Sequence, residues 1–272
     1  MKQLIVIADM EGASGIFEHN RDALLHEELF PDKLLWREYG RNCITSDVLA
    51  VCFAANDFGI DEILLYDMHF AGCTESNIIV EKLPANVNFF DTPSRCFLWS
   101  RIRGQAIINP FGIITVGQHA RNGDDNAYFS HTIHTPPLER FIINNLSIAE
   151  IGMTVMCFNG TPYVANIGCA ASHREAIELS PNVSCISVKD KLNKWEPSPK
   201  EAYPLIYNGV LEALKAIDNK TAYEHTGICS CSLSLSEGYK FSAPDSFPWK
   251  GGFTEREAFL QAPDIEIALM PA

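Results

Sequence analysis

The sequence predicts an α/β protein with a three-layer α/β/α architecture around a mostly parallel sheet, plus a smaller C-terminal α+β domain. Three observations support this fold class. Short apolar runs rich in β-branched residues recur between residues 4 and 167, and segments of helical periodicity separate them. The composition, with 47% hydrophobic and 20% charged residues in 272, is that of a folded chain. Strands alternating with helices favour parallel pairing through crossover connections.

Four apolar runs are predicted as strands. They occupy residues 4–8, 63–66, 113–117 and 163–167. Polar residues do not alternate with apolar ones inside these runs, which is typical of strands buried on both faces of a parallel sheet.

Two helices are predicted between these strands. Apolar residues recur at a spacing of three to four over residues 33–58, and Gly59 follows as a stop signal. The apolar positions of this helix are Leu35, Tyr39, Cys43, Leu49, Cys52 and Ala55. A second helix is expected over residues 148–158, closed by Asn159-Gly160.

A third helix begins at a capping box formed by Ser198 and Glu201, with Pro199 at the first helical position. We expect it to run toward residue 217, and Pro204 either kinks it or marks its true start. Its predicted buried side holds Leu205, Val210, Leu214 and Ile217.

The stretch 190–199 is charged and contains two prolines, so we place a domain boundary there. Residues 1–190 are predicted to form an α/β metal-binding catalytic domain. Residues 191–272 are predicted to form the smaller α+β domain, whose tail after Thr226 is rich in Ser, Gly and Pro.

Composition excludes several classes of partner. A net charge of −13 without a Lys/Arg cluster argues against a nucleic-acid-binding protein. No run approaches the roughly 20 apolar residues that span a bilayer, so no membrane partner is expected. Asp9 and Glu11 interrupt the first apolar run too early for an export signal. The 9 scattered cysteines are therefore interpreted as reduced thiols of a cytoplasmic protein.

Groups able to bind a metal follow the predicted strands. Asp9 and Glu11 follow the first strand, Asp67 and His69 the second, and His119 the third. Ligands of open α/β sheets bind beyond the carboxyl ends of the strands. Carboxylates and imidazoles gathered there suit a zinc-type site, and a divalent cation relieves the repulsion between the carboxylates.

Each residue also has a structural explanation. An aspartate after a strand is often a turn or a cap, and a single histidine is more often hydrogen-bonded than a ligand. Glu150 is explained by a capping box with Ser147. His131 and His134 are either exposed loop residues or a proton donor or base beside a metal. The shared position after successive strands favours the metal site.

Five short segments, in order, resemble the M55 family of metallopeptidases. They are DMEGASG at 9–15, DMH at 67–69, GQHA at 117–120, SHT at 130–132 and NNLSIAEIG at 144–152. Order and spacing agree from residue 1 to about residue 215. The pattern departs at Gly168-Cys169, where the family has an aspartate, at Met68, and in the tail after about residue 226.

The resemblance implies a two-zinc centre. Asp9 bridges the two metals in this scheme, and Glu11, His69, His119 and Glu150 complete the coordination. His131 matches the family's catalytic histidine. The implied activity is an aminopeptidase that removes an N-terminal, D-configured residue from short peptides. The implied assembly is a homo-oligomer, a decamer of two stacked pentamers.

Several alternatives stay open at this point. We expect metal-activated water to attack the carbonyl while His131 moves protons, and the rival scheme makes His131 the nucleophile. Another dinuclear-metal amidohydrolase or phosphoesterase would use the same ligand types. A non-catalytic peptide-binding homologue is the third alternative.

Overall fold

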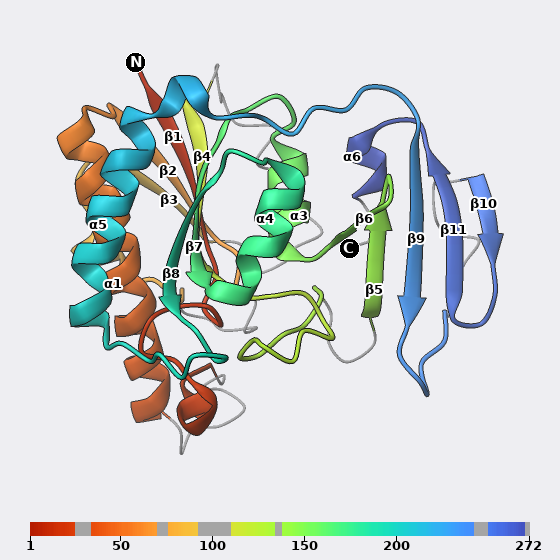
Figure 1. Ribbon diagram of the computed structural model, residues 1–272, viewed down its shortest axis with the longest axis horizontal. Helices are drawn as coiled ribbons and strands as arrows, with labels where there is room; N and C mark the ends of the chain where they lie inside the picture. The colour runs from red at the N-terminus through yellow and green to blue at the C-terminus, as the bar shows by residue number, and fades with distance from the viewer. Residues whose placement is uncertain (25–33, 70–75, 92–109, 134–137, 242–249, 270–272) are drawn as a thin grey trace.

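A computed structural model describes residues 1–24, 34–69, 76–91, 110–133, 138–241 and 250–269. Its elements form layers that lie side by side in Figure 1. Two long helices cover one face of a parallel sheet, two shorter helices cover the other, and a second, antiparallel sheet lies beyond the shorter helices. The predicted α/β/α class is therefore confirmed, with an additional sheet.

The first sheet has six parallel strands in the order β3-β2-β1-β4-β7-β8. Its strands are β1 (Gln3–Ala8), β2 (Glu62–Asp67), β3 (Val87–Asp91), β4 (Gly112–Gln118), β7 (Tyr163–Cys169) and β8 (Ser184–Lys189). Strands β1, β4 and β7 are buried at every position, as their mostly apolar runs predict. The four predicted strands are confirmed, and β3 and β8 are additional.

Helices α1 (Leu34–Phe58) and α5 (Pro199–Lys215) pack against each other on one face of this sheet. Helices α3 (Glu150–Cys157) and α4 (His173–Leu179) cover the opposite face (Figure 1). Short 3-10 helices complete this half: η1 (Glu18–Leu24), η3 (Val80–Lys82), η4 (Ala170–Ser172) and η5 (Ile217–Asn219). The three predicted helices are thus present.

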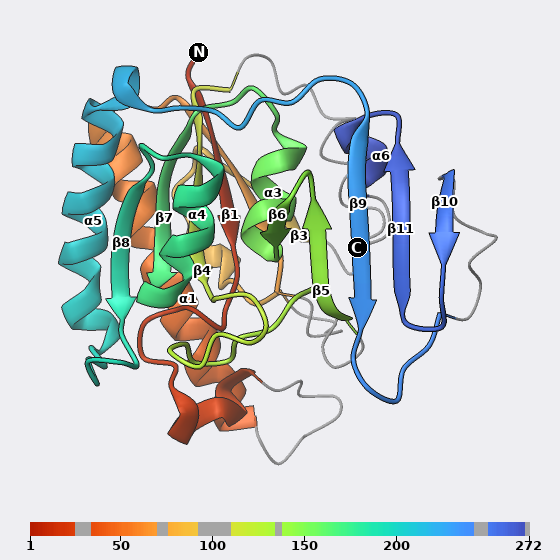
Figure 2. The same ribbon diagram turned by 45° about the vertical axis from the view of Figure 1, so that its right-hand side comes forward.

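The second sheet is antiparallel, in the order β10-β11-β9-β5-β6. Its elements are β5 (Leu138–Ile143), β6 (Leu146–Ile148), β9 (Cys229–Leu235), β10 (Lys250–Phe253), β11 (Glu257–Ala262) and the short helix α6 (Ile265–Ala268). Figure 2 shows α6 against this sheet. One hydrophobic core joins the two sheets, because Phe141 of β5 and Leu233 of β9 belong to the same buried cluster as Ile7 of β1.

Elements on each side of the predicted boundary at residue 190 pack with elements on the other side. Strands β5 and β6 precede that residue yet pair in the second sheet, where β5 bonds to β9. Helix α5 follows it yet packs on the first sheet against α1, β7 and β8. The division into residues 1–190 and 191–272 therefore stays a prediction, and the two sheets do not divide there.

Three of the apolar positions used to predict these helices are exposed. Leu35 and Tyr39 of α1 are 88% and 39% exposed, and Leu205, predicted on the buried side of α5, is 45% exposed. The buried stripe of α1 contains the remaining predicted positions near its middle, such as Cys43 and Cys52, together with Ile44, Val48 and Val51. Ile217 lies beyond α5, in η5. The capping box of Ser198 and Glu201 is confirmed, and Pro204 lies inside the helix.

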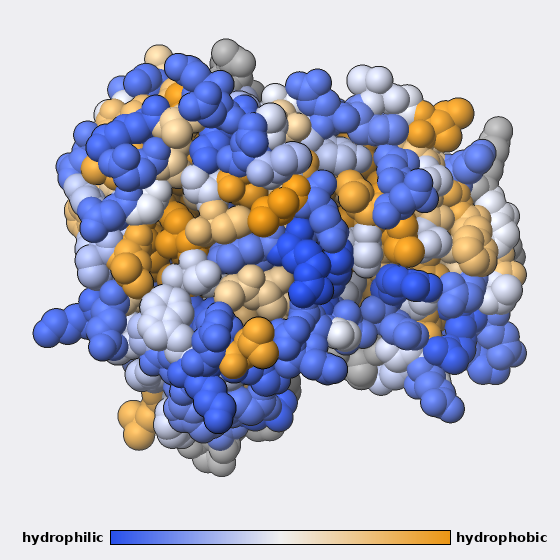
Figure 3. Space-filling view, viewed as in Figure 1, coloured by the Kyte–Doolittle hydropathy of each residue, from blue (hydrophilic) through white to orange (hydrophobic). Residues whose placement is uncertain are grey.

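Hydrophilic residues cover most of the face seen in Figure 3, with hydrophobic side chains in separate patches among them. Among the described residues, no helix combines the length and the apolar character needed to cross a bilayer.

Candidate metal centre

The centre lies where three neighbouring parallel strands end. Asp9 follows β1, His69 lies just after β2, and His119 follows β4. The strands are in register at this edge, since Ala8 is level with Asp67 on one side and with Val116 on the other. Side chains that are far apart in the sequence therefore meet at one point, as the position after successive strands predicts.

Two glycines allow the backbones at this edge to touch. A Cβ on Gly12 would lie 1.9 Å from the carbonyl oxygen of Gln118, and one on Gly117 would lie 1.9 Å from that of Asp9. Gly117 also has a φ of +74°, which side chains disfavour. The Gly12 N–H donates to the Gly117 carbonyl at 2.8 Å, so the segment carrying Glu11 is held against the one carrying His119.

The first half of the centre contains Asp9, Glu11 and His69. His69 Nδ1 lies 2.9 Å from Glu11 Oε2 and 3.6 Å from Asp9 Oδ1. Asp9 also reaches the other half, because its Oδ2 is 3.4 Å from Nε2 of His119. The Asp9 carboxylate therefore lies between two imidazoles.

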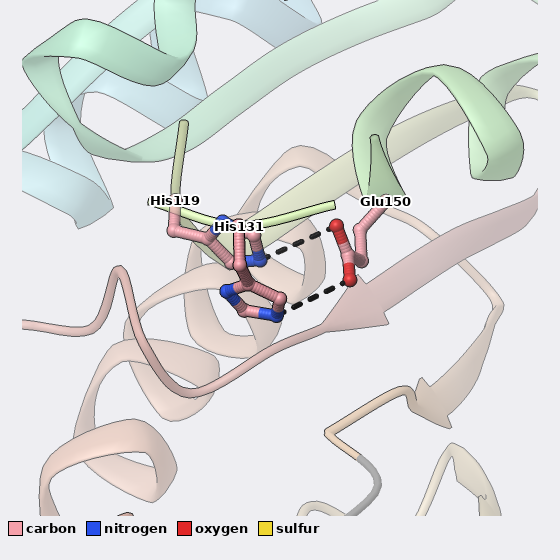
Figure 4. Close-up of side chains that lie close together, drawn as sticks. All are labelled: His119, His131 and Glu150. Carbon is pink, nitrogen blue, oxygen red and sulfur yellow. Dashed lines mark ion pairs between the residues drawn. The ribbon is translucent and has the colours of Figure 1, made fainter. Parts of the chain in front are cut away.

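The second half contains His119, His131 and Glu150. The two imidazole rings stack with centroids 3.9 Å apart and an interplanar angle of 14°. Both present Nε2 to the Glu150 carboxylate, His119 at 3.3 Å and His131 at 3.4 Å (Figure 4). His131 Nε2 is also 3.7 Å from Glu11 Oε1, so the histidine faces both halves.

Glu150 is the first residue of α3, and its structural explanation from the sequence is wrong. Ser147 lies in strand β6, and the residue that precedes the helix, Ala149, makes no side-chain cap. Glu175 of α4 takes that role, because its Oε1 accepts from the N–H groups of Ala149 and Gly152 at 2.7 Å each. The Glu150 side chain is thereby left to face the histidines.

His131 lies in a strained segment. Phe129 and Ile133 have φ values of 52° and 49°, which are unfavourable for bulky side chains and above all for a β-branched one. The carbonyl of Phe129 accepts from Nδ1 of His131 at 2.9 Å, and the carbonyl of Ala120 accepts from Nδ1 of His119 at 2.8 Å. Both rings therefore carry a proton on Nδ1 and turn Nε2 into the centre.

Electrostatic interactions in the centre favour the ionised carboxylates of Glu11 and Glu150 and the protonated imidazoles of His69 and His119. Burial opposes ionisation of Glu11 and Glu150, but the imidazoles of His69 and His119 outweigh it and hold both carboxyl pKa values well below the ordinary range. Burial likewise opposes protonation of His69 and His119, yet Glu11 and Glu150 raise the pKa of each to about 10. Burial and the nearby Glu11 raise the pKa of Asp9.

The donor set fits a divalent cation. Two groups of three side chains, Asp9–Glu11–His119 and His119–His131–Glu150, each bring one ligand atom from every member within 4.8 Å of the others. Among the described residues, Asp9 Oδ2, His69 Nε2 and His119 Nε2 are buried and make no hydrogen bond. Such atoms are costly to bury, and a metal would satisfy them.

Some residues singled out from the sequence lie elsewhere. Asp67 belongs to neither ligand group, and it accepts from the N–H and the side-chain amide of Asn77 and from the His69 N–H. His134 lies outside the described residues. Cys229 and Cys231 are free thiols in strand β9 of the second sheet.

Four supporting residues have no recognisable role in the sequence: Asp47, Asn77, Glu175 and Lys189. Each is buried, and each holds the backbone of a segment that carries a residue of the centre. In the sequence they are ordinary polar residues, although Glu175 in Arg174-Glu175-Ala176 and Lys189 in Val188-Lys189 lie in short runs that also resemble the family.

The chain was compared with known proteins. The family model of peptidase M55, described as D-aminopeptidase, matches residues 1–265. The comparison with curated proteins found no match. The fold is similar to a solved structure described as the Zn-dependent D-aminopeptidase DppA from Bacillus subtilis, a self-compartmentalizing protease. The TM-score is 0.80 at 21% identity, covering 98% of this chain and 94% of the other. The chain therefore belongs to the M55 peptidase family.

Proposed function

We propose that this M55 peptidase is a zinc-dependent aminopeptidase that releases an N-terminal, D-configured residue from short peptides. The observation that carries the proposal is the pair of ligand groups, which share His119. His131 belongs to one of them, and its ring stacks on that of His119. Membership of a peptidase family supports the reaction class, and the similarity to a Zn-dependent D-aminopeptidase supports zinc and the D configuration.

In this proposal Asp9, Glu11, His69, His119 and Glu150 would hold two zinc ions. The two oxygens of Asp9 face His69 and His119, so its carboxylate would be shared between the two ion sites. When bound, the ions would supply Lewis acidity for polarising the scissile carbonyl and for lowering the pKa of water toward ~7. The stacked rings and the carbonyls that fix their tautomers orient the ligand nitrogens.

His131 is the proton carrier in this proposal. Its Nδ1 proton is held by the Phe129 carbonyl, so Nε2 is the nitrogen that exchanges a proton. That atom faces Glu11 and Glu150, and both carboxylates raise the pKa of His131 against the effect of burial. A protonated Nε2 can pass its proton to the departing amine of the peptide. This role needs no acyl-imidazole, which the rival nucleophile scheme requires.

The same proposal includes assembly and location. We propose a homo-oligomer, specifically the decamer of two stacked pentamers implied by the family resemblance. The similar solved structure, DppA, is a self-compartmentalizing protease, and this supports an assembly. The cytoplasmic location rests on the odd number of scattered cysteines in the sequence.

A substrate panel tests the reaction. The purified zinc-loaded protein is assayed with D-Ala-D-Ala, L-Ala-L-Ala, an N-acetylated D-dipeptide and a phosphate ester. We expect hydrolysis of the D-dipeptide and none of the acetylated analogue, because an aminopeptidase requires a free amine. Hydrolysis of the phosphate ester alone would replace this proposal with a phosphoesterase, and no turnover at full zinc occupancy would favour a binding protein.

A further inference from the structure

The segment that carries two of the proposed ligands has no regular structure. Residues 9–16, called here the ligand loop, connect β1 to the turn before η1 and include Asp9 and Glu11. Most of the loop is buried, and buried backbone groups outside helices and strands need other partners. The orientation of the two carboxylates therefore depends on what holds this backbone.

Lys189 holds the carbonyl groups of the loop. Its Nζ donates to the carbonyl oxygens of Glu11 at 2.6 Å, Ala13 at 3.0 Å and Ile16 at 2.5 Å. Three acceptors require three N–H donors, so the group is an ammonium rather than a neutral amine. The side chain is 0% exposed at the end of β8, and the loop folds around it.

Asp47 holds hydrogen-bond donors of the same loop, whereas Lys189 holds acceptors. Its carboxylate in the middle of α1 accepts from the Ser14 N–H at 2.8 Å and from the Ser14 hydroxyl at 2.6 Å. This side chain is also 0% exposed. A buried cation and a buried anion thus hold the carbonyl and amide sides of one short segment.

Lys189 also contacts the part of the chain that leads to His131. The rings of Tyr128 and Phe129 lie 5.7 Å from its Nζ, a distance at which a cation is attracted to an aromatic face. The carbonyl of Phe129 in turn fixes Nδ1 of His131. One ammonium therefore adjoins both the ligand loop and the support of the proposed proton carrier.

We propose that Lys189 and Asp47 are positioning residues that hold the ligand loop in the conformation required for zinc binding. The inference rests on the proposed zinc centre and adds two residues to it, neither of which touches the metal. Ionised side chains are costly to bury, and an apolar side chain would fill the Lys189 position at lower cost if only packing mattered there. Three carbonyl groups that converge on one charge explain why a lysine is used.

The test compares zinc affinity with thermal stability in single variants. Lys189→Met keeps the volume and removes the ammonium, and Asp47→Asn keeps the shape and removes the negative charge. Ser14→Ala removes one hydroxyl and is a mild third variant that keeps the fold. Ile206→Ala, a buried substitution on α5, is the control for general destabilisation. Zinc affinity is measured on metal-free protein by competition with a chromophoric chelator, well below every melting temperature.

We expect zinc to bind about 10- to 100-fold more weakly to the Lys189 and Asp47 variants. Ser14→Ala is expected to weaken binding several-fold, and Ile206→Ala to lower the melting temperature with affinity within about twofold of wild type. If Lys189→Met does not fold, Asp47→Asn and Ser14→Ala decide the question.

Wild-type zinc affinity in all the folded loop variants, with only the melting temperature lowered, would overturn the inference and leave Lys189 and Asp47 as ordinary stabilising residues. Failure of the wild-type protein itself to bind zinc would instead overturn the proposed function. The two failures are therefore distinguishable in the same experiment.

Discussion

The two sheets of this protein bury different kinds of side chain. The parallel sheet is apolar along its strands and gathers carboxylates and imidazoles at the edge where β1, β2 and β4 end. The antiparallel sheet buries apolar side chains on one face and turns Ser230, Phe259 and Gln261 outward on the other. The centre therefore lies at the edge of the first sheet, apart from Glu150, which begins α3 after β6 of the second sheet, while the second sheet otherwise contributes core.

This difference assigns the edge of the parallel sheet to function and the antiparallel sheet to stability. Buried charges at the parallel edge oppose folding unless a partner or a metal satisfies them, so their presence is explained by chemistry. Phe141 and Leu233 of the second sheet are explained by packing. Substitutions in the two regions should therefore affect different measurements, and the following predictions test that division.

The largest effect is expected at His119, which belongs to both ligand groups. His119→Ala should abolish measurable peptide hydrolysis and reduce bound zinc, because one change removes a nitrogen from each group. Metal analysis and a dipeptide assay measure both quantities. His19→Ala, at an exposed histidine, is the matched control and should change neither.

His131→Ala is expected to lower kcat by about 10²–10⁴. Bound zinc should stay at the wild-type level, because the proposal makes His131 a proton carrier rather than a required ligand. Steady-state kinetics and metal analysis on the same preparation measure the two effects. Loss of one zinc per chain would show that His131 is a ligand, as its membership of one ligand group also allows.

Phe141→Ala tests the second sheet. Phe141 is 0% exposed in β5, and its truncation should lower the free energy of unfolding by about 3–5 kcal/mol. Activity per folded molecule should be unchanged, since no proposed ligand lies in this strand. Urea unfolding and kinetics of the folded fraction provide the measurement. A loss of kcat in the fully folded Phe141→Ala protein would contradict the separate roles proposed for the two sheets.

The pH dependence of stability should arise in the parallel half, and Glu175 provides one test. Burial raises its pKa to about 7, above the ordinary value of 4.5, so the folded chain holds this proton more tightly than the unfolded chain does. The resulting stability is full below pH 4.5 and is lost as the pH rises through about 7, a change of roughly 1–3 kcal/mol. Glu175→Gln should lack this loss in urea unfolding of metal-free protein at pH 4.5–8. If the free energies of unfolding of Glu175→Gln and wild type differ by the same amount across that range, the raised pKa of Glu175 is contradicted.

The smallest effect is expected on the outward face of the second sheet. Phe259 is 59% exposed, so Phe259→Ser should change the free energy of unfolding by no more than about 0.5 kcal/mol and leave kcat unaltered. Light scattering on the same variant reports on the assembly. A large loss of stability at low protein concentration, together with a smaller particle, would mean that this face is covered by another subunit.

The sequence predicted those strands whose local pattern reflects their burial. The run LIVIA, part of β1, is apolar throughout because both of its faces are covered. Strand β8, with the sequence SCISVK, was missed because its first four positions are partly or fully exposed at the sheet edge and include two serines. Strand β9 was missed because serines occupy one of its faces.

The residues of the centre divide in a similar way. Asp9, His69 and His119 could be placed from the sequence because each follows a strand. Glu150 could not, because its local pattern with Ser147 matches a helix cap, and only the contact with Glu175 frees it for the centre. Lys189 is a charged residue like many on the surface, and no local pattern distinguishes one that is surrounded by three distant carbonyls.

The most direct test of the zinc centre is a titration of metal-free protein with zinc, in which bound metal and hydrolysis of a D-dipeptide are followed in the same samples. The proposed centre predicts no turnover before zinc is added and a rise that saturates at two zinc ions per chain. Full turnover in the metal-free protein, or saturation of binding below one ion per chain, would contradict it.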